Sequence, residues 1–220
     1  MYKPLSRLTV FAVTALTSLC LSAQQPAGDI NLIMVGDSTV ANYKPELVIR
    51  GWGQVFGRFF IDRVKIDNRA ISGRSTKTFM EKGDWDKTMQ KLSAGDVVMI
   101  QFGHNDSHGP KKPESTKADE DYKDNLRKYV DDVLSKKATP ILVTPMHRGI
   151  FTKDGKVTQE MQPYVDAMKA VAAEKKVVCI DLYAPTGKII QDLGKDKLDP
   201  IFCSVKDRTH FSEKGALIIA

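Results

Sequence analysis

The sequence predicts an α/β protein in which a five-stranded parallel sheet is covered by helices on both faces. Short apolar segments rich in branched residues alternate with longer segments of helical periodicity. The chain has 220 residues, which fits one ordinary domain. Its composition is 42% hydrophobic and 27% charged, close to the globular average. These three observations together indicate a single packed domain rather than a disordered chain.

The strands and helices are expected to alternate along the chain. The apolar runs predict buried strands at residues 30–35, 64–66, 97–102, 141–143 and 177–180. The helical periodicity predicts helices at residues 52–61, 85–92, 119–135, 159–174 and 182–193. Alternation of this kind is typical of parallel strands joined by crossover helices, which places helical layers on both faces of the sheet.

The final segment, residues 212–220, begins like a helix. Ser212 is a suitable cap and Glu213 lies in the first turn. The segment has neither a glycine nor a basic last turn at its end. We therefore expect the native helix to continue beyond Ala220.

The first residues have the pattern of a signal peptide. Lys3 and Arg7 precede an uncharged run that ends with small residues at the close of residues 1–23. This run is shorter than the roughly 20 apolar residues of a membrane span, and the leucine before Cys20 disfavours lipidation. We expect the leader to be removed, residues 24–220 to form the folded domain, and the protein to be periplasmic or extracellular without a stable membrane anchor.

The charge distribution does not favour a nucleic-acid partner. The formal net charge is +6, and loss of Lys3 and Arg7 with the leader would lower it to +4. The bases are scattered among acidic neighbours, as on an ordinary solvated surface, although an acidic substrate stays possible. Cys179 and Cys203 would survive cleavage; a disulfide and two free thiols both remain open.

Polar residues gather directly after the predicted strands, where ligands bind in open α/β sheets. Ser38 follows the first strand in a glycine-containing turn, and Asp207 and His210 lie three residues apart at the predicted start of the final helix. A serine hydroxyl becomes a strong nucleophile when an imidazole accepts its proton and a third group orients that imidazole. We therefore predict Ser38 as nucleophile, His210 as base and Asp207 as its orienting acid.

An acyl-transfer site also needs donors for the negative charge that develops on the tetrahedral intermediate. The backbone N–H groups of Ser38 and Gly73 and the side-chain amide of Asn105 are the candidates. Gly73 suits this role because a glycine lets the backbone approach a ligand closely. Asn105 follows the third predicted strand, so its amide can reach the same crevice.

Two other hydrolytic signatures are absent or weak. The Gly-x-Ser-x-Gly elbow of α/β-hydrolases is missing, since Thr39 and Val40 follow Ser38. His104 and His108 have a spacing that superficially suits zinc, but the intervening residues and the following Gly-Pro predict a loop. No metal site is predicted.

The combination of motifs resembles the SGNH/GDSL hydrolase family over nearly the whole mature chain. The four blocks of that family are matched by Gly36-Asp37-Ser38, Gly73, Gly103-His104-Asn105-Asp106 and Asp207-Arg208-Thr209-His210. Further segments look like its rhamnogalacturonan acetylesterase branch: Gly36-Asp37-Ser38-Thr39-Val40, Gly51-Trp52-Gly53-Gln54, Asn68-Arg69-Ala70, Gly73-Arg74-Ser75 and Thr209-His210-Phe211-Ser212. The resemblance implies a three-layer α/β/α flavodoxin-like fold, no metal or organic cofactor, and release of acetyl groups from decorated pectin.

Three further residues are predicted to bind an acidic polysaccharide or oligosaccharide. Arg148 and His147 follow the fourth strand and Arg74 follows Gly73, so all three belong on the rim of the same crevice. An arginine can grip a uronate carboxylate, although a structural salt bridge is the alternative. Two other functions also remain open: a lipid or thioester hydrolase with the same catalytic residues, and a glycan-binding protein without turnover.

Overall fold

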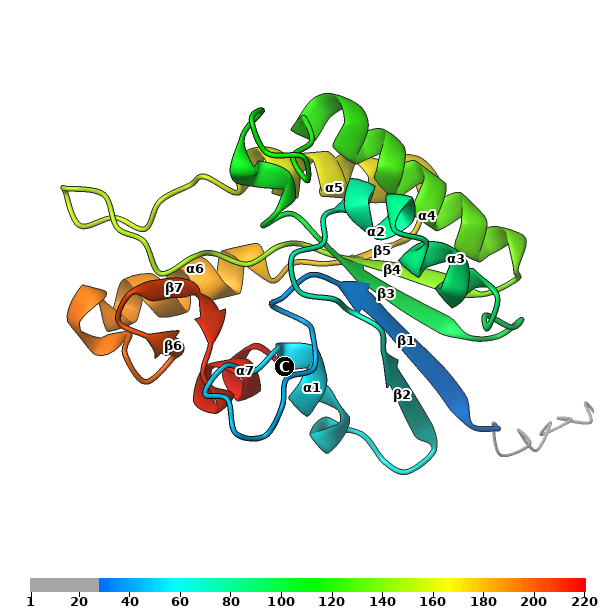
Figure 1. The fold of residues 1–220 in the computed structure, drawn as a ribbon, viewed down its shortest axis with the longest axis horizontal. Coiled ribbons are helices and arrows are strands. Elements are labelled where there is room, and N and C mark those ends of the chain that lie inside the picture. The colour runs from blue at the N-terminus through cyan, green and yellow to red at the C-terminus, as the bar shows by residue number, and fades with distance from the viewer. Residues whose placement is uncertain (1–27) are drawn as a thin grey trace, which may run out of the picture.

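The computed structural model describes residues 28–220, so the predicted signal peptide at residues 1–23 lies outside the described residues. Five parallel strands form one sheet in the order β2-β1-β3-β4-β5 (Figure 1). The strands are β1 (Ile30–Gly36), β2 (Val64–Asn68), β3 (Val97–Gln101), β4 (Thr139–Val143) and β5 (Val178–Ile180). This order is that of flavodoxin-like folds, which confirms the predicted class.

Helices cover both faces of the sheet, as Figure 1 shows. The upper layer consists of α2 (Thr76–Glu81), α3 (Asp84–Met89), α4 (Lys123–Ser135) and α5 (Gln162–Lys175). The lower layer contains α1 (Trp52–Phe56), α6 (Tyr183–Leu193) and α7 (Glu213–Ile219). Short 3₁₀ turns lie at Gly57–Phe59, Asp106–His108 and Lys195–Lys197, and a π-helical turn at Ala118–Tyr122 precedes α4.

Alternate residues of β1 divide between two hydrophobic cores. Ile33 and Val35 belong to the cluster that contains Tyr129 of α4. Leu32 and Met34 belong to the cluster that contains Trp52 of α1. Because successive side chains of a strand point to opposite faces, a strand that is buried on both faces needs a continuous apolar run. The sequence of β1 therefore meets the requirement of a central strand.

The strand order places a topological switch point between β1 and β3. From β1 the chain crosses to β2 on one side, and β3 then pairs with β1 on the other side. The two crossovers leave in opposite directions, so a crevice opens at the carboxyl ends of β1 and β3. Ser38 follows β1 and Asn105 follows β3, which places both beside this crevice.

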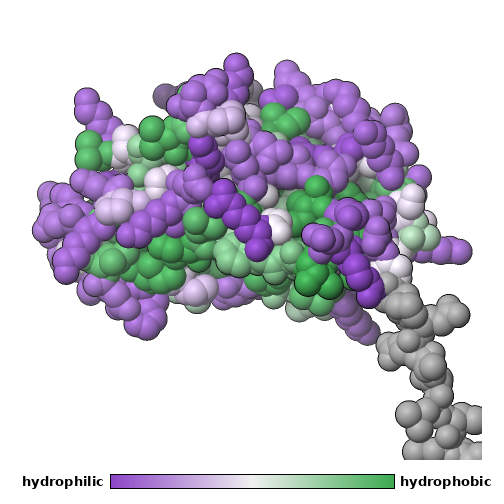
Figure 2. All heavy atoms as spheres, turned by 90° about the horizontal axis from the view of Figure 1, so that it is seen from below, coloured by the Kyte–Doolittle hydropathy of each residue, from purple (hydrophilic) through white to green (hydrophobic). Residues whose placement is uncertain are grey.

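One part of the lower sheet face is left open. An apolar hollow of about 280 Å³ lies there, and Figure 2 shows apolar side chains gathered on this side of the molecule. Its lining consists of Ile30, Leu32, Phe56, Phe60, Val64, Val97, Met99, Ile141 and Ile180. None of the helices among residues 28–220 has both the length and the apolar character needed to cross a membrane.

The structure differs from the sequence prediction in three elements. Helix α2 was not predicted, because its six residues carry no apolar repeat and its Ser75–Thr78 capping box is the main local signal. An antiparallel hairpin of β6 (Phe202–Ser204) and β7 (Asp207–Phe211) was also missed. Cys179 and Cys203 are free thiols, which decides the question that the sequence left open.

Candidate active site

The turn after β1 holds Ser38 at the edge of the sheet. Asp37 accepts hydrogen bonds from the backbone N–H and the hydroxyl of Thr39, at 2.8 and 2.7 Å. Tyr43 donates its hydroxyl to the Ser38 carbonyl at 2.8 Å. The turn is thus fixed on both sides of Ser38, which limits how far the hydroxyl can move.

A second segment supports this turn from below. Gly51 lies so close to the chain at Val40 and Ala41 that an added Cβ would come within 2.2 Å of the Ala41 carbonyl oxygen. The adjoining Trp52 is buried and donates its indole N–H to Gln101 Oε1 at 3.0 Å. Glycine is required at position 51 because of this close approach, and it lets α1 pack directly beneath the nucleophile turn.

His210 reaches Ser38 from the β6–β7 hairpin. Its Nε2 lies 2.8 Å from Ser38 Oγ, and its Nδ1 lies 2.7 Å from Asp207 Oδ2. Since an ionised carboxylate only accepts hydrogen bonds, Nδ1 carries the proton and Nε2 is left free to accept the serine proton. The three predicted residues therefore form one continuous hydrogen-bonded chain.

Asp207 is kept ionised by its neighbours. Partial burial acts to raise its pKa, but hydrogen bonds from the backbone and ring of His210 and from the backbone of Thr209 lower the pKa to about 2. The two backbone N–H groups both donate to Asp207 Oδ1 at 3.0 Å. Asp207 can therefore hold the imidazole and stabilise the positive charge that forms on it during proton transfer.

The expectation that Asp207 and His210 begin the final helix is wrong. Both residues lie in β7, and α7 begins only at Glu213 with Ser212 as its cap, whose Oγ accepts the Gly215 N–H at 3.2 Å. Asp207 accepts N–H groups from two and three residues ahead, which is also what a helix cap does. The sequence pattern alone therefore does not distinguish the start of a helix from a strand such as β7.

The loop that carries Gly73 has the backbone geometry that a predicted oxyanion donor needs. Gly73 has a φ of +75°, which suits glycine, and no other atom lies within 4 Å of the position that its Cβ would occupy. The backbone N–H groups of Ser38 and Gly73 donate to no acceptor within residues 28–220. The Ile71 N–H donates to the Gly36 carbonyl at 3.0 Å, which ties the Gly73 loop to the end of β1.

A hydrogen bond from one of its two amide protons orients the Asn105 side chain. Its Nδ2 donates to the Arg74 carbonyl at 2.8 Å, and the side chain is largely buried. An amide nitrogen carries two protons, so the second remains free for a substrate oxygen. The bond to Arg74 joins the turn after β3 to the Gly73 loop, so the two segments that carry these candidate donors are tied to each other.

Asp106, the residue after Asn105, anchors the loop that carries Gly73. It accepts hydrogen bonds from the hydroxyls of Thr76 and Thr116, at 2.6 and 2.9 Å, and from the Thr76 N–H. Complete burial raises the pKa of Asp106 to about 7 in spite of these donors. Asp106 was not predicted from the sequence to have a role, although its position beside Asn105, shortly after a buried strand, was a usable signal.

Arg148 and Arg74, the two arginines predicted to bind substrate, are engaged within the protein. Arg148 donates to Glu160 Oε1 at 2.8 Å and to the His104 carbonyl at 2.9 Å, and its side chain is 13% exposed. Arg74 pairs with Asp84 at 2.8 Å. These contacts favour the salt-bridge alternative for both residues, and uronate binding by either stays a prediction.

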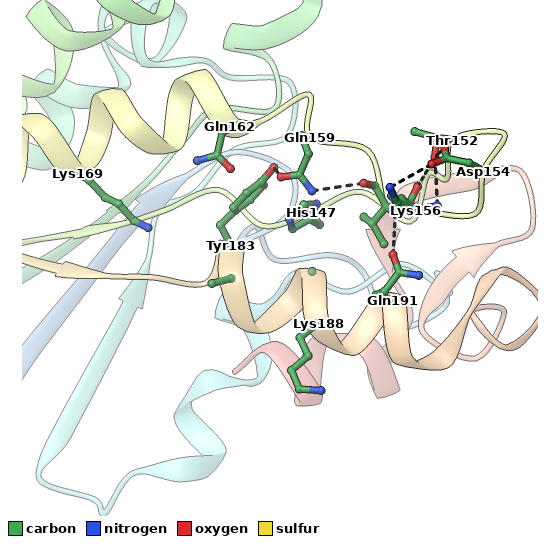
Figure 3. A pocket seen from close by; sticks show the side chains of 13 residues that line it. His147, Thr152, Asp154, Lys156, Gln159, Gln162, Lys169, Tyr183, Lys188 and Gln191 are labelled. Carbon is green, nitrogen blue, oxygen red and sulfur yellow. Dashed lines mark hydrogen bonds and ion pairs between the residues drawn. The ribbon is translucent and has the colours of Figure 1, made fainter.

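His147 lines a cavity of about 810 Å³ whose lining includes none of Ser38, Asp207 and His210 (Figure 3). Its ring stacks on Tyr183 at 3.7 Å between centroids, and Nδ1 lies 3.1 Å from the Thr158 carbonyl. Burial lowers the pKa of His147, which favours the neutral ring. Three lysines line the cavity, and each is paired with an aspartate: Lys156 with Asp154, Lys169 with Asp181, and Lys188 with Asp192.

No group of three or more histidine, cysteine, aspartate or glutamate side chains within residues 28–220 is arranged to hold a metal ion. His104 and His108, which have a superficial zinc spacing, contact different carboxylates. His104 faces Asp37 inside the protein, whereas His108 pairs with Glu114 near the surface. The described residues therefore offer hydroxyl, imidazole and carboxylate chemistry at this site.

A match to a protein-family profile shows to which family the chain belongs. The profile of the GDSL-like lipase/acylhydrolase family matches residues 34–218. The chain belongs to this family. It is accordingly an ester hydrolase, and its fold and motifs agree with the resemblance found in the sequence.

Two of the similar proteins have names that specify an activity. The chain is 36% identical over 204 residues to the rhamnogalacturonan acetylesterase RhgT of Bacillus subtilis, covering 87% of this chain and 86% of that protein. It is 27% identical to the rhamnogalacturonan acetylesterase of Emericella nidulans, covering 94% and 87% of the two chains. The resemblance to the acetylesterase branch is therefore confirmed at the level of sequence.

Solved structures of related proteins share the fold of this esterase. The crystal structure of the Bacillus subtilis protein YxiM superposes with a TM-score of 0.76 at 28% identity, covering 89% of this chain and 55% of that one. The acetylxylan esterase Axe2 of Geobacillus stearothermophilus superposes with a TM-score of 0.67 at 21% identity, covering 88% and 92% of the two chains. The second likeness establishes the fold alone.

Proposed function

We propose that this esterase removes acetyl groups from a plant cell-wall polysaccharide, rhamnogalacturonan or a related pectin, through an acyl-enzyme on Ser38. The observation that carries the proposal is the hydrogen-bonded chain from Ser38 through His210 to Asp207. The 36% identity to a rhamnogalacturonan acetylesterase over most of the chain supports the choice of substrate.

The first half of the reaction transfers the acetyl group to the enzyme. His210 Nε2 accepts the proton of Ser38 Oγ as that oxygen attacks the acetyl carbonyl carbon. The carbonyl oxygen becomes negatively charged and accepts hydrogen bonds from the Ser38 and Gly73 N–H groups and from Asn105 Nδ2. The intermediate collapses, the bond to the sugar oxygen breaks, and His210 gives its proton to the departing alcohol.

The second half releases acetate. A water molecule attacks the acetyl-Ser38 carbonyl while His210 Nε2 takes its proton. The same three donors stabilise the second tetrahedral intermediate, and the proton returns from His210 to Ser38 Oγ as acetate leaves. Asp207 stays ionised throughout, because its pKa of about 2 lies far below the working range of such an enzyme.

The test compares substrates on the wild-type enzyme and on Ser38→Ala. Mass spectrometry after incubation with acetylated rhamnogalacturonan oligosaccharides should show loss of acetyl groups with wild type and none with the variant. Ser135→Ala, at the end of α4 and exposed, is the matched control and should behave as wild type. Nitrophenyl acetate should be hydrolysed far faster than a long-chain nitrophenyl ester.

Three results would contradict the proposal. Preference for the long-chain ester would favour the lipid or thioester alternative. Binding of pectin fragments without acetate release, and without labelling by a fluorophosphonate, would favour a glycan-binding protein. Faster deacetylation of acetylated xylan than of rhamnogalacturonan would agree with the proposed reaction but contradict the proposed substrate.

We also propose export with removal of residues 1–23, from the leader pattern in the sequence. Fractionation of producing cells should place the mature chain in the periplasm or the medium. N-terminal sequencing of that chain should begin at Gln24. A cytoplasmic protein that still carries Met1 would contradict this assignment.

A further inference from the structure

A second histidine–carboxylate pair lies directly behind the nucleophile turn. Asp37 immediately precedes Ser38, and His104 immediately precedes Asn105. His104 Nδ1 lies 3.3 Å from Asp37 Oδ2, and the two side chains are 2% and 0% exposed. The pair is therefore sealed from solvent, and no substrate atom can reach it without rearrangement of the site.

Both ring nitrogens of His104 face groups that accept hydrogen bonds. Nδ1 faces the Asp37 carboxylate, and Nε2 lies 3.1 Å from the Met146 carbonyl oxygen. A neutral imidazole has one N–H and one lone pair, so either tautomer would set a lone pair against an acceptor inside the protein. An imidazolium donates from both nitrogens and satisfies both acceptors.

The alternative is a protonated Asp37 that donates to a neutral His104. The other oxygen of Asp37 already accepts from the N–H and the hydroxyl of Thr39, as expected of a carboxylate. The pKa of Asp37 lies below its usual value: burial acts to raise it, whereas His104 and the hydrogen bonds from Thr39 act to lower it. The part that comes from His104 presupposes a charged ring, so the two hydrogen bonds from Thr39 are what favours an ionised Asp37.

The pair joins three strand ends. Asp37 lies at the end of β1, His104 follows β3, and Met146 follows β4. Two other charged groups lie close: Arg148 donates to the His104 carbonyl, and Asp106 follows two residues after His104. We propose that His104 is held as an imidazolium and that its ion pair with Asp37 is a positioning element, which fixes the Ser38 turn relative to the Asn105 turn.

This inference rests on the proposed roles of Ser38 and Asn105. A nucleophile and an oxyanion donor must be held within a fraction of an ångström of their working geometry, because small displacements lower the rate strongly. A link between the residues that directly precede them restricts both turns at once. His104 therefore acts through Ser38 and Asn105, and it does not contact substrate.

The charge state is tested by nitrogen-detected NMR on wild-type protein labelled with ¹⁵N-histidine. At pH 8 an ordinary histidine is neutral, since its pKa is about 6.5. We expect His104 to show two protonated ring nitrogens at that pH, with its signals assigned by their loss in His104→Gln. In Asp37→Asn, one of the two nitrogens should lose its proton. A single protonated nitrogen in wild type at pH 8 would overturn the proposal, and this measurement requires no activity.

The positioning role is tested by kinetics with nitrophenyl acetate. His104→Gln should lower kcat about 10- to 100-fold and leave KM within about twofold, because misplaced groups act mainly in the transition state. The double variant with Asp37→Asn should be no slower than the worse single variant, since the pair acts as a unit. Additive losses, or a rise in KM alone, would overturn the role.

The matched control is His108→Gln, in the exposed pair with Glu114, where kcat should equal that of wild type. Thermal unfolding of each variant separates lost folding from lost positioning. If the buried variants fail to fold, the NMR result on wild type decides the charge state. An inactive wild-type enzyme would defeat the proposed function, whereas the ring nitrogens of His104 would still report on the ion pair.

Discussion

The active site contains two histidine–carboxylate pairs that differ in exposure. In the outer pair, His210 and Asp207 lie on the β6–β7 hairpin with side chains 27% and 35% exposed. In the inner pair, His104 and Asp37 are almost completely buried behind the nucleophile turn. The carboxylate faces the Nδ1 of the histidine in both pairs, so the difference between them lies elsewhere.

That difference is the partner of the second ring nitrogen. Nε2 of His210 faces the Ser38 hydroxyl, which can give up a proton, whereas Nε2 of His104 faces a backbone carbonyl, which cannot. A hydroxyl partner suits an imidazole that takes up and returns a proton in each cycle. A carbonyl partner suits one that keeps both protons. The same two residue types therefore suit the proposed proton transfer at one place and the proposed positioning at the other.

The largest effect is expected for the outer pair and its nucleophile. Ser38→Ala and His210→Ala should each lower kcat by about 10⁴-fold or more, because proton transfer and attack both fail. The double variant should be no slower than either single variant, as nitrophenyl acetate hydrolysis would measure. Activity within tenfold of wild type in either single variant would remove the distinction between the two pairs.

The next effect concerns the acid of the outer pair. Asp207→Asn should lower kcat about 10³- to 10⁴-fold, since the amide no longer stabilises the imidazolium and can favour the wrong tautomer. The same assay at pH 7 and 8 measures this loss. A loss below tenfold would show that the hairpin backbone alone orients His210.

Asn105→Ala should have a smaller effect, lowering kcat about 10²- to 10³-fold with little change in KM. The lost donor acts mainly on the charged intermediate, so ground-state binding is spared. Full kinetic curves on nitrophenyl acetate separate the two constants. A change in KM alone would instead identify Asn105 as a substrate-binding residue.

Arg148→Ala should cost about three- to tenfold in kcat, equally on nitrophenyl acetate and on acetylated rhamnogalacturonan fragments. The guanidinium supports the His104 carbonyl next to Asn105, so its loss should loosen the inner pair for every substrate. Glu160→Gln, which removes only the ionic partner, is the companion variant and should lose less. A rise in KM confined to the acidic oligosaccharide would instead support the predicted uronate contact.

The smallest effect is on stability. Asp207 has a folded pKa of about 2, below its usual 3.8, so its ionised form stabilises the native state above pH 3.8, and this contribution is lost as the pH falls through 2. The free energy of unfolding of wild type minus that of Asp207→Asn should therefore decrease as the pH falls from 4 towards 2. Urea titrations at each pH measure it. A difference that stays unchanged below pH 4 would contradict the assigned ionisation.

The sequence predicted the sheet, and it predicted residues that the structure brings to one edge of it, because both depend on local order. Each strand is a short apolar run, and Ser38 and Asn105 directly follow such runs. Since parallel strands end at one edge, sequence order alone brings these residues together. The hairpin was not predicted, because Asp207 and His210 are three residues apart in the sequence just before Ser212, and this spacing also occurs at the start of helices.

The predictions for substrate-binding residues depended on side-chain partners that are distant in sequence. Arg148 pairs with Glu160 and with the carbonyl of His104, which is 44 residues away. Neither bond can be predicted from the periodicity of the sequence. The inner pair is likewise formed by residues 67 positions apart. Position after a strand predicts which residues reach the crevice. It does not predict which of these side chains already form hydrogen bonds or salt bridges within the protein.

The hydrogen bond between Ser38 and His210 joins residues 172 positions apart. Closing so long a loop carries an entropic cost that grows only slowly with length. The proposed base reaches Ser38 only when the final hairpin is docked at the carboxyl end of β1, so a chain that lacks β7 has no base at this site. We therefore expect the onset of nitrophenyl acetate hydrolysis during refolding to report the docking of the final hairpin.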